Sequence, residues 1–483
     1  GFLISGGFVL SGYADGNLFA NASARFTEAY QPGITGSDPD DLKNILYIIN
    51  KDDKPFGTAW QRWKDAVQLG AEFYDGDGDG IYNPVDKNGN GIWDKNEDAP
   101  LLLSDEIIWC VYNDNLPIDY RRWRSEPKGI EVRQTIFVSN EPELDNIVFF
   151  RYSILNTGVV TDKIDSVYFS IWHDVDLSES SKDFIGCDTT INSGYYYKAD
   201  DQNSQNEPVS FFTSLLQGPV IYTNNPADTA SKNYGLLFGN EKISGARNLN
   251  MTSFVFPVLS DLNFNEPANI IEANNLLQGK TKQGYYLDPC SSPYLEVRGE
   301  VDCNNINPRF WSSGDPFNNQ GWILKNPEDV GAFLNTGPFL LERDTPQEII
   351  FAYVMDKGSD VLNSIENTRT SVQRAIDEYK SNFASMTYVP PPAILVNDYV
   401  LHQNYPNPFN PNTTIRYEIP QDGLITIEVF DILGQKVKTI LNEFKSAGRY
   451  DVKFNSAGLS SGIYIYQLRA ENFVTSKKML LLK

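Results

Sequence analysis

The sequence has few of the residues and motifs on which catalytic and zinc sites commonly depend. Among its 483 residues are four cysteines, four methionines and two histidines. It contains no CxxC pair, no HExxH, no GxSxG elbow between a strand pattern and a helix pattern, and no phosphate-binding glycine loop. We therefore predict that the protein is not an enzyme. A glycoside hydrolase stays open as an alternative, because that chemistry needs only two carboxylates, and acidic residues are abundant here.

Long apolar runs and an excess of positive charge are also absent. No stretch approaches the roughly 18 to 20 apolar residues that a membrane-spanning helix needs, so we predict no transmembrane segment. The 63 acidic and 40 basic residues give a formal charge of −23, which repels nucleic-acid phosphates. This charge is uneven, with −26 on residues 1–400 and +3 on residues 401–483. We expect two units with different surfaces and no nucleic-acid partner.

The sequence is rich in aromatic residues, and many of them stand in short β-type runs. There are 28 Phe, 26 Tyr and 8 Trp. Runs such as 107–114 and 146–158 combine β-branched and aromatic residues and are bounded by Asn, Gly, Pro or Asp. Helical spacing of apolar residues is clear at 58–72 and 359–383. These patterns predict a mainly β fold.

The order of these patterns divides the chain. Residues 1–387 are predicted to form a large β-rich, sandwich-like domain with one or two helices and with long loops at about 200–345. A Pro- and Asn-rich linker is predicted at 388–411. Six or seven short strands at 412–483 predict a small sandwich of the immunoglobulin type.

The strongest chemical signal is the run EFYDGDGDGIYNPVDKNGNGIWDKNED at residues 72–98. It fits two overlapping 12-residue calcium loops, in which alternate side chains, a backbone carbonyl at position 7 and an acid at position 12 surround the ion. In this assignment Asp86 ends the first loop and begins the second. The predicted ligands are Asp75, Asp77, Asp79 and the carbonyl of Ile81 in the first loop, and Asp86, Asn88, Asn90, the carbonyl of Ile92, Asp94 and Glu97 in the second.

Calcium at these loops is predicted to be structural. Glu97 can reach an ion with both of its oxygens, whereas Asp86 is shorter, so we expect the second site to be the tighter one. The shared Asp86 does not suit two separate helix-loop-helix hands, and the run resembles the compact aspartate repeats of thrombospondin type 3 or dockerin modules. The alternative is an acidic, solvated turn that binds no ion.

A looser acidic cluster follows the predicted strand VYFSIWHDVD. It either holds a further cation or caps loops. His173 lies at the end of that strand with no second histidine nearby, so we expect an exposed or hydrogen-bonded role for it rather than ligation. The members of the cluster are Asp174, Asp176, Asp183 and Asp188.

The four cysteines suggest one disulfide and leave a second one open. Cys290 and Cys303 lie in a loop-like run, where a bridge would restrict a segment with little periodicity of its own, and we predict that they pair. Cys110 and Cys187 either form a second bridge, if their segments meet in space, or remain two buried thiols.

Several stretches of the last 83 residues carry a family resemblance: LHQNYPNPFNPNTTIRYEIP, VFDILGQKVKTI, GRYDVKFNSAGLSSGIYIYQLRA and SKKMLLLK. They resemble the type A C-terminal sorting domain of proteins exported by the type IX secretion system. The resemblance implies that the outer-membrane secretion machinery is a partner, and that the protein reaches the cell surface or the extracellular space.

The preceding part also resembles a group of uncharacterised secreted proteins that bear this sorting domain. The matching motifs are GAEFYDGDGDGIYNP, EIIWCVYND, GIEVRQT, IVFFRYSILN, VYFSIWHDVDL and DFIGCDTTIN. This resemblance implies an extracellular location and calcium binding, and it implies no catalytic residue.

Together these observations predict a secreted, calcium-stabilised structural protein of the cell surface or extracellular space. We expect it to associate with itself, as a homo-oligomer or as a polymer in the form of a filament, sheath or layer. The alternatives are a secreted protein that binds or degrades polysaccharide, in which acidic loops would line a sugar groove, and an adhesin.

Overall fold

The computed structural model describes residues 3–23, 29–177, 183–198, 208–235, 238–386, 398–421, 423–445, 448–470 and 473–483. The chain divides into two units. The first, here called the large unit, comprises Gly1–Asp53, Arg62–Tyr74 and Pro100–Tyr388. The second comprises Lys54–Gln61, Asp75–Ala99 and Val389–Lys483. Among the described residues, no helix combines the length and apolar character that a membrane crossing requires.

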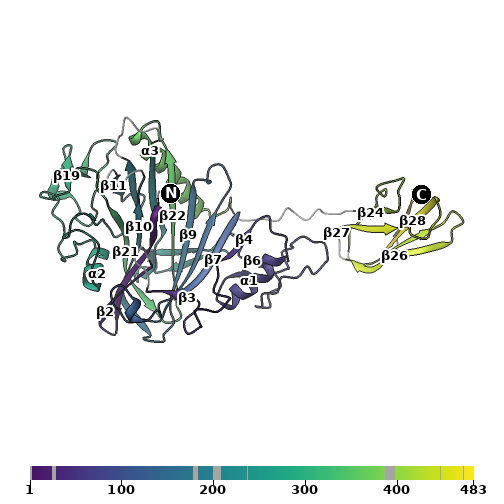
Figure 1. Cartoon of the computed structure of the whole chain (residues 1–483), viewed down its shortest axis with the longest axis horizontal. Helices are drawn as coiled ribbons and strands as arrows, with labels where there is room; N and C mark the ends of the chain where they lie inside the picture. Colours follow the sequence, from purple (N-terminus) through teal and green to yellow (C-terminus); the bar gives the residue numbers. More distant parts are fainter. Residues whose placement is uncertain are drawn as a thin grey trace. The chain divides into compact units, whose positions relative to one another are not determined.

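One sheet of the large unit has five antiparallel strands (Figure 1). The N-terminal strand pairs on one side with the hairpin strand that follows it and on the other with a strand from the middle of the chain. The spatial order is β18 (Ser253–Val255), β21 (Gly331–Glu342), β10 (Lys163–Val175), β1 (Leu3–Ala14) and β2 (Asn17–Ser23).

The second sheet of the large unit has nine strands, and it collects most of the β-branched and aromatic runs predicted from the sequence. Eight of them follow one another in space: β11 (Asp183–Asp188), β12 (Ser193–Lys198), β13 (Val209–Gln217), β22 (Gln347–Lys357), β9 (Ile147–Asn156), β8 (Ile130–Val138), β7 (Glu106–Asn113) and β3 (Gln31–Pro32). The ninth, β4 (Tyr47–Asn50), also pairs with β7.

The inner faces of both sheets supply one hydrophobic core. Phe8 of β1 is fully buried. Its ring lies 5.4 Å from that of Phe169 in its own sheet and 5.3 Å from that of Tyr152 in the other sheet. Burying one such side chain contributes about 1.5 to 3 kcal/mol. The predicted mainly β, sandwich-like architecture is confirmed.

Three helices are present among the described residues: α1 (Thr58–Gln68), α2 (Ile270–Leu277) and α3 (Val361–Lys380). The last two belong to the large unit, where α2 packs against β1, β2 and β21, and α3 packs against β13 and β22. Helix α3 begins where Asp360 accepts the Asn363 N–H at 2.9 Å, which satisfies one of the free donors of its first turn.

The region predicted as long loops also contains short two-stranded ladders. β14 pairs with β17, β15 with β16, and β19 with β20. Outside these ladders stand β5 and β6, which flank the aspartate-rich segment, and two 3₁₀ turns at Ile118–Tyr120 and Cys303–Asn305. The bounds are β5 (Phe73–Tyr74), β6 (Ala99–Pro100), β14 (Val220–Tyr222), β15 (Thr229–Asn233), β16 (Asn240–Ser244), β17 (Ala246–Asn248), β19 (Leu295–Arg298) and β20 (Gly321–Leu324).

The C-terminal residues form a sandwich of a three-stranded and a four-stranded antiparallel sheet. Its core includes Leu401 and Phe409, so residues 398–411, predicted as linker, belong to the sandwich; residues 388–397 lie outside the described residues. The strands are β23 (Val400–Leu401), β24 (Asn412–Ile419) and β27 (Gly448–Asn455), and β26 (Lys436–Lys445), β25 (Gly423–Phe430), β28 (Gly462–Ala470) and β29 (Phe473–Leu481).

The cysteines behave differently from one another. Cys290 and Cys303 form a disulfide with a Cα–Cα distance of 5.2 Å. Cys110 and Cys187 are free thiols, so the second bridge left open by the sequence does not form. Cys110 lies on β7 and Cys187 on β11, with five strands between them in the sheet, a separation of about 29 Å at the usual strand spacing.

Alkylation should distinguish these pairs. In the denatured, unreduced protein we expect iodoacetamide to label Cys110 and Cys187 alone, and all four cysteines after reduction. Peptide mass mapping measures this.

Replacing both Cys290 and Cys303 by serine should lower the free energy of unfolding by about 2 to 4 kcal/mol, because a short closed loop is released in the unfolded chain. The control, Cys110→Ser, leaves the mapped bridge in place, and a bridge that includes Cys110 would contradict the assignment.

Candidate metal centre

The first predicted loop is held in shape by carboxylates that accept backbone N–H groups. Asp75 Oδ1 accepts the Gly78 N–H at 2.7 Å, and Asp75 Oδ2 accepts the Gly80 N–H at 2.9 Å. Asp77 and Asp79 each accept the N–H group two residues further along the chain. Because a carboxylate oxygen has more than one lone pair, the same side chains can also ligate a cation.

The second loop repeats this pattern. Asp86 Oδ1 accepts the Gly89 N–H at 2.6 Å, and Asp86 Oδ2 accepts the Gly91 N–H at 2.7 Å. Asn88 and Asn90 accept the N–H groups two residues further on, as the acids do in the first loop. Gly89 and Gly91 have φ values of 73° and 74°, a left-handed conformation that glycine adopts without strain. Two different sequences therefore fold into equivalent turns.

Glu97 closes the second loop. Its Oε1 accepts the Lys87 N–H at 2.6 Å, and its Oε2 accepts the Asp94 N–H at 2.9 Å. These donors are positions 2 and 9 of the loop that begins at Asp86. Glu97 thus spans the loop with both oxygens, at the position where a calcium loop needs its terminal acid.

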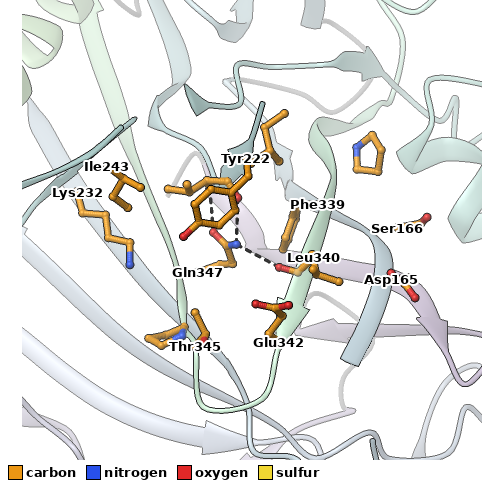
Figure 2. A pocket seen from close by; sticks show the side chains of 14 residues that line it. Asp165, Ser166, Tyr222, Lys232, Ile243, Phe339, Leu340, Glu342, Thr345 and Gln347 are labelled. Carbon is orange, nitrogen blue, oxygen red and sulfur yellow. Dashed lines mark hydrogen bonds between the residues drawn. The ribbon is translucent and has the colours of Figure 1, made fainter. Parts of the chain in front are cut away.

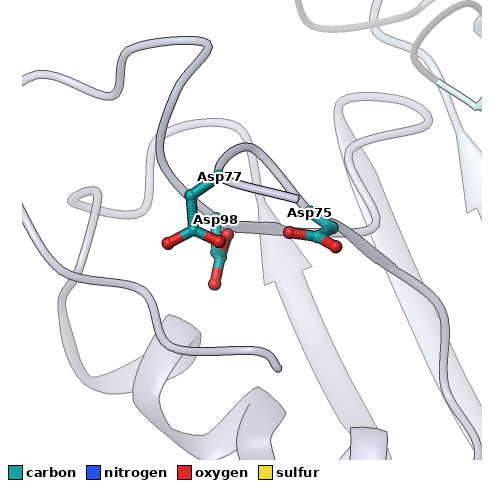
Figure 3. Close-up of side chains that lie close together, drawn as sticks. All are labelled: Asp75, Asp77 and Asp98. Carbon is teal, nitrogen blue, oxygen red and sulfur yellow. The ribbon is translucent and has the colours of Figure 1, made fainter. Parts of the chain in front are cut away.

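Asp98 closes the first loop in the same way. Its two oxygens accept the Gly76 N–H at 3.1 Å and the Asn83 N–H at 2.7 Å, which are positions 2 and 9 of that loop. Asp75, Asp77 and Asp98 each present a carboxylate oxygen, and these oxygens lie within 4.8 Å of one another (Figure 3). Two consecutive acids therefore serve the two loops.

This geometry corrects the part that the sequence assigned to Asp86 in the first loop. The Asp86 carboxylate accepts three N–H groups, all of them in the second loop. Asp98 instead joins Asp75 and Asp77. The 12-residue pattern places the terminal acid at position 12 of its own loop. Here the chain enters a second loop directly, so the acid that closes the first comes from beyond the second.

The closing acids are buried. Glu97 is 0% and Asp98 2% exposed. Burial raises the pKa of Glu97, and the negative charges of Asp94 and Asp86 add to this effect. A buried carboxylate without a compensating positive charge costs several kcal/mol. The backbone N–H groups that surround Glu97 and Asp98 offset only part of that cost.

The possible metal-ligating atoms of this segment suit a hard cation. Residues 75–98 contain no cysteine and no histidine, and their side chains offer carboxylate and amide oxygens, which calcium prefers. One positive group is close: Lys87 Nζ lies 2.7 Å from Asp77 and lowers its pKa. Both side chains are partly exposed, where such a pair contributes little, so a divalent ion can displace the ammonium group.

Aromatic residues anchor the segment to the first turn of α1. The Tyr82 hydroxyl donates to the Trp60 carbonyl at 3.0 Å. Trp93, which is 1% exposed, donates from Nε1 to the Glu97 carbonyl at 2.8 Å, and its ring lies 6.5 Å from that of Trp60. This packing holds the backbone of both loops in place, which favours a rigid site over a switch.

The second acidic cluster has a different membership from the predicted one. Oxygens of Asp174, Asp176 and Asp329 lie within 4.8 Å of one another. Asp188 is not part of this group: it lies 3.3 Å from the guanidinium of Arg369. Along a strand, successive side chains alternate between faces, so Asp188 points to the opposite face from Asp183 at the other end of β11.

His173 lies in an aromatic environment. It is fully buried, and its ring lies within 6.1 Å of the rings of Tyr196, Phe211 and Tyr353. Burial lowers its pKa to about 3, so the imidazole is neutral. The predicted exposed or hydrogen-bonded role is wrong: the ring is buried, and neither of its nitrogens has a hydrogen-bond partner among the described residues.

The large unit also has an open hollow of about 430 Å³ (Figure 2). Gln347, one of its lining residues, connects two others by donating from Nε2 to the carbonyls of Val220 and Leu340, both at 3.1 Å. The Tyr222 side chain, 71% exposed, stands at this hollow. The remaining lining residues include acidic Asp165 and Glu342, basic Lys232, and Ser166, Ile221, Ile243, Pro338, Phe339, Thr345 and Pro346.

Comparison with known proteins identifies the C-terminal sandwich. Residues 403–482 match the family model of the secretion system C-terminal sorting domain. This match supports the resemblance to the type IX sorting domain. The protein is therefore secreted and reaches the cell surface or the extracellular space, and its C-terminal domain interacts with the secretion machinery. The match does not extend to the residues before 403, for which the resemblance to calcium-loop-bearing secreted proteins stays a prediction.

The other comparisons do not assign an activity. No curated protein matches the chain. A polysaccharide lyase structure is 8% identical with a TM-score of 0.19, over 73% of this chain and 34% of the lyase. The structure of dimeric latent PorU from Porphyromonas gingivalis is 10% identical with a TM-score of 0.15, over 78% of this chain and 31% of PorU. The chain thus spans about a third of either structure, and likenesses this weak carry no argument.

The two closing acids should be separable by mutation. We expect Glu97→Ala and Asp98→Ala each to weaken calcium binding at one loop by tenfold or more (~1.4 kcal/mol), because each removes a carboxylate that spans its loop. Isothermal titration calorimetry on the full chain measures this. Asn83→Ala is the matched control, because Asn83 contributes its backbone N–H to Asp98, which alanine retains.

Chelation supplies the second half of this test. Removal of calcium should lower the melting temperature of the wild type, and each alanine variant should lose part of that calcium-dependent gain. Equal melting temperatures with and without chelator would contradict a structural ion. A result in which Glu97→Ala and Asn83→Ala bind calcium alike would contradict the geometric assignment of the second loop.

Proposed function

We propose that this secreted chain is a calcium-stabilised structural protein that assembles with copies of itself at the cell surface or in the extracellular space. It is not an enzyme in this proposal. The support for calcium is the pair of equivalent loops with buried closing acids at Glu97 and Asp98. Rigid packing of the loops against α1 suits ions that stay in place and stiffen a scaffold.

The observation that carries self-association is an exposed apolar strand edge. In β4, Tyr47 and Ile49 point into the core while Ile48 is 48% exposed. β4 pairs with β7 on one side, and the described residues provide no strand on its other side. The preceding turn exposes Leu42 (92%) and Leu46 (62%). A free strand edge with apolar neighbours is the surface that another copy of the chain can extend.

Concentration-dependent assembly tests this proposal. In millimolar calcium we expect light scattering and negative-stain electron microscopy to show particles that grow with protein concentration. Leu46→Lys and Ile48→Lys should shift the population toward monomers, because the first places a charge in the turn before β4 and the second places one on β4 itself. Leu262→Lys is the control: Leu262 is 83% exposed and lies outside this segment. Strictly monomeric wild-type particles at every concentration would contradict self-association.

A second candidate function is polysaccharide binding, and the hollow beside Tyr222 is the observation that favours it. An exposed aromatic ring next to carboxylates is a common way to hold a sugar, since the ring packs on the apolar face and the acids accept hydroxyl protons. Asp165 and Glu342 are the carboxylates at this hollow. An adhesin would share the extracellular location and differ in its partner.

A glycan array probed with the full chain tests this candidate. If it holds, Tyr222→Ala should reduce binding of the recognised glycan by about tenfold, since stacking on an aromatic ring contributes about 1 kcal/mol or more. Tyr405→Ala serves as the control, because Tyr405 is 82% exposed and lies on the C-terminal sandwich. An array without signal, or equal binding by both variants, would remove this candidate.

A further inference from the structure

A second group of acids lies where the two sheets of the large unit come together. Asp174 is the second-to-last residue of β10 in the five-stranded sheet. It pairs with Gly331 of β21 and is 4% exposed. Asp176 follows β10, and Asp329 precedes β21. Carboxylate oxygens of these three acids lie within 4.8 Å of one another. Three like charges at such distances repel strongly unless a positive charge neutralises them.

Asp183 connects this group to the nine-stranded sheet. It begins β11 and is 1% exposed. Its Oδ2 accepts the N–H of Leu177, the residue after Asp176, at 3.0 Å. Its backbone carbonyl accepts the N–H of Glu328, the residue before Asp329, at 3.1 Å. The Asp183 carboxyl is thereby held between the two chain segments that carry Asp176 and Asp329.

The remaining oxygen of Asp183 has no partner. Oδ1 is buried and makes no hydrogen bond to any of the described residues. A buried carboxylate oxygen without a donor is rare in folded proteins, because it loses its hydration and gains nothing in return. A proton on Oδ1, shared with a neighbouring carboxylate, would remove one negative charge and leave the repulsion among the other acids. A bound cation satisfies the oxygen and neutralises the neighbouring acids at the same time.

The charges around Asp183 point in the same direction. The negative charges of Asp176 and Asp329 act on the Asp183 carboxyl. The opposing positive charge is that of Lys198, which faces Asp183 across the β11–β12 ladder. Among the described residues whose charges act on the Asp183 carboxyl, this one ammonium group faces the carboxylates of Asp176 and Asp329.

We infer that Asp174, Asp176, Asp183 and Asp329 bind one calcium ion that joins the two sheets of the large unit. The group consists of carboxylates, with no cysteine or histidine, so a hard cation is preferred over zinc or copper. Calcium accepts several carboxylates directly, whereas magnesium keeps most of its waters, so a cluster of four acids favours calcium. The site is separate in sequence and in residues from the loops at 75–98.

Calcium stoichiometry on the full chain tests the inference. We expect Asp183→Asn to bind one calcium ion fewer per chain than the wild type in equilibrium dialysis, while a Glu97→Ala, Asp98→Ala double variant retains this ion. Asp188→Asn is the matched control, since it removes the same charge from the same strand, but from a residue that pairs with Arg369. Loss of the ion in Asp183→Asn but not in Asp188→Asn supports the site.

The melting temperature gives a second test. The difference between Asp183→Asn and the wild type should have opposite signs in chelator and in calcium. In chelator, Asp183→Asn should melt at the wild-type temperature or above it, because a buried carboxylate beside like charges becomes neutral. In calcium it should melt below the wild type. A merely structural role for Asp183 would lower the melting temperature in both conditions, and that result would overturn the inference.

Asp329→Asn keeps the inference testable if Asp183→Asn fails to fold, as judged by near-ultraviolet circular dichroism. Asp329 is only half-buried, and its substitution should remove the same ion. If Asp183→Asn and Asp329→Asn bind as much calcium as Asp188→Asn and the wild type, the site does not exist. The loops at 75–98 could still bind calcium in that case, so failure of this inference is distinguishable from failure of the proposed function.

Discussion

Buried carboxylates set the strongest constraint on this fold. Glu97, Asp98 and Asp183 are each at most 2% exposed, and each sits beside other acids. Removing such a group from water is costly, and backbone N–H groups restore only part of its hydration energy. The apolar core between the sheets creates the framework, but these acids require a counter-charge. A divalent cation that prefers oxygen ligands is the counter-charge that we propose for them.

The sequence predicts the parts of these sites that are local, and it misses those that depend on tertiary contacts. The alternation of acids, amides and glycines from Asp75 onward specifies the turns by itself, because each side chain bonds to an N–H two to five residues away. Asp98 closes a loop that begins more than twenty residues earlier. The one available signal was that Glu97 has an acidic neighbour beside two consecutive loops.

The same distinction explains the second cluster and the domain boundary. Asp329 joins Asp174 only because β21 pairs with β10, which no local pattern indicates. The sequence places Asp188 in this cluster because it is close to Asp183 along the chain. Side chains alternate between the two faces of a strand, however, so Asp188 points to the opposite face from Asp183. Residues 398–411 resemble a linker in composition, yet Leu401 and Phe409 reach the core of the C-terminal sandwich. The β-rich fold class, in contrast, follows directly from repeated short runs of β-formers.

Export would favour the calcium binding that we propose. Extracellular calcium modules have dissociation constants of about 10⁻⁴ to 10⁻³ M. For a site at the tighter end of this range, a millimolar calcium concentration is about ten times the dissociation constant. Each such ion then contributes about 1.4 kcal/mol, and three would contribute about 4 kcal/mol. That is a large fraction of the 5 to 15 kcal/mol by which a domain is typically stable. With the proposed ions bound, the protein would therefore be most stable in the compartment to which its sorting domain directs it.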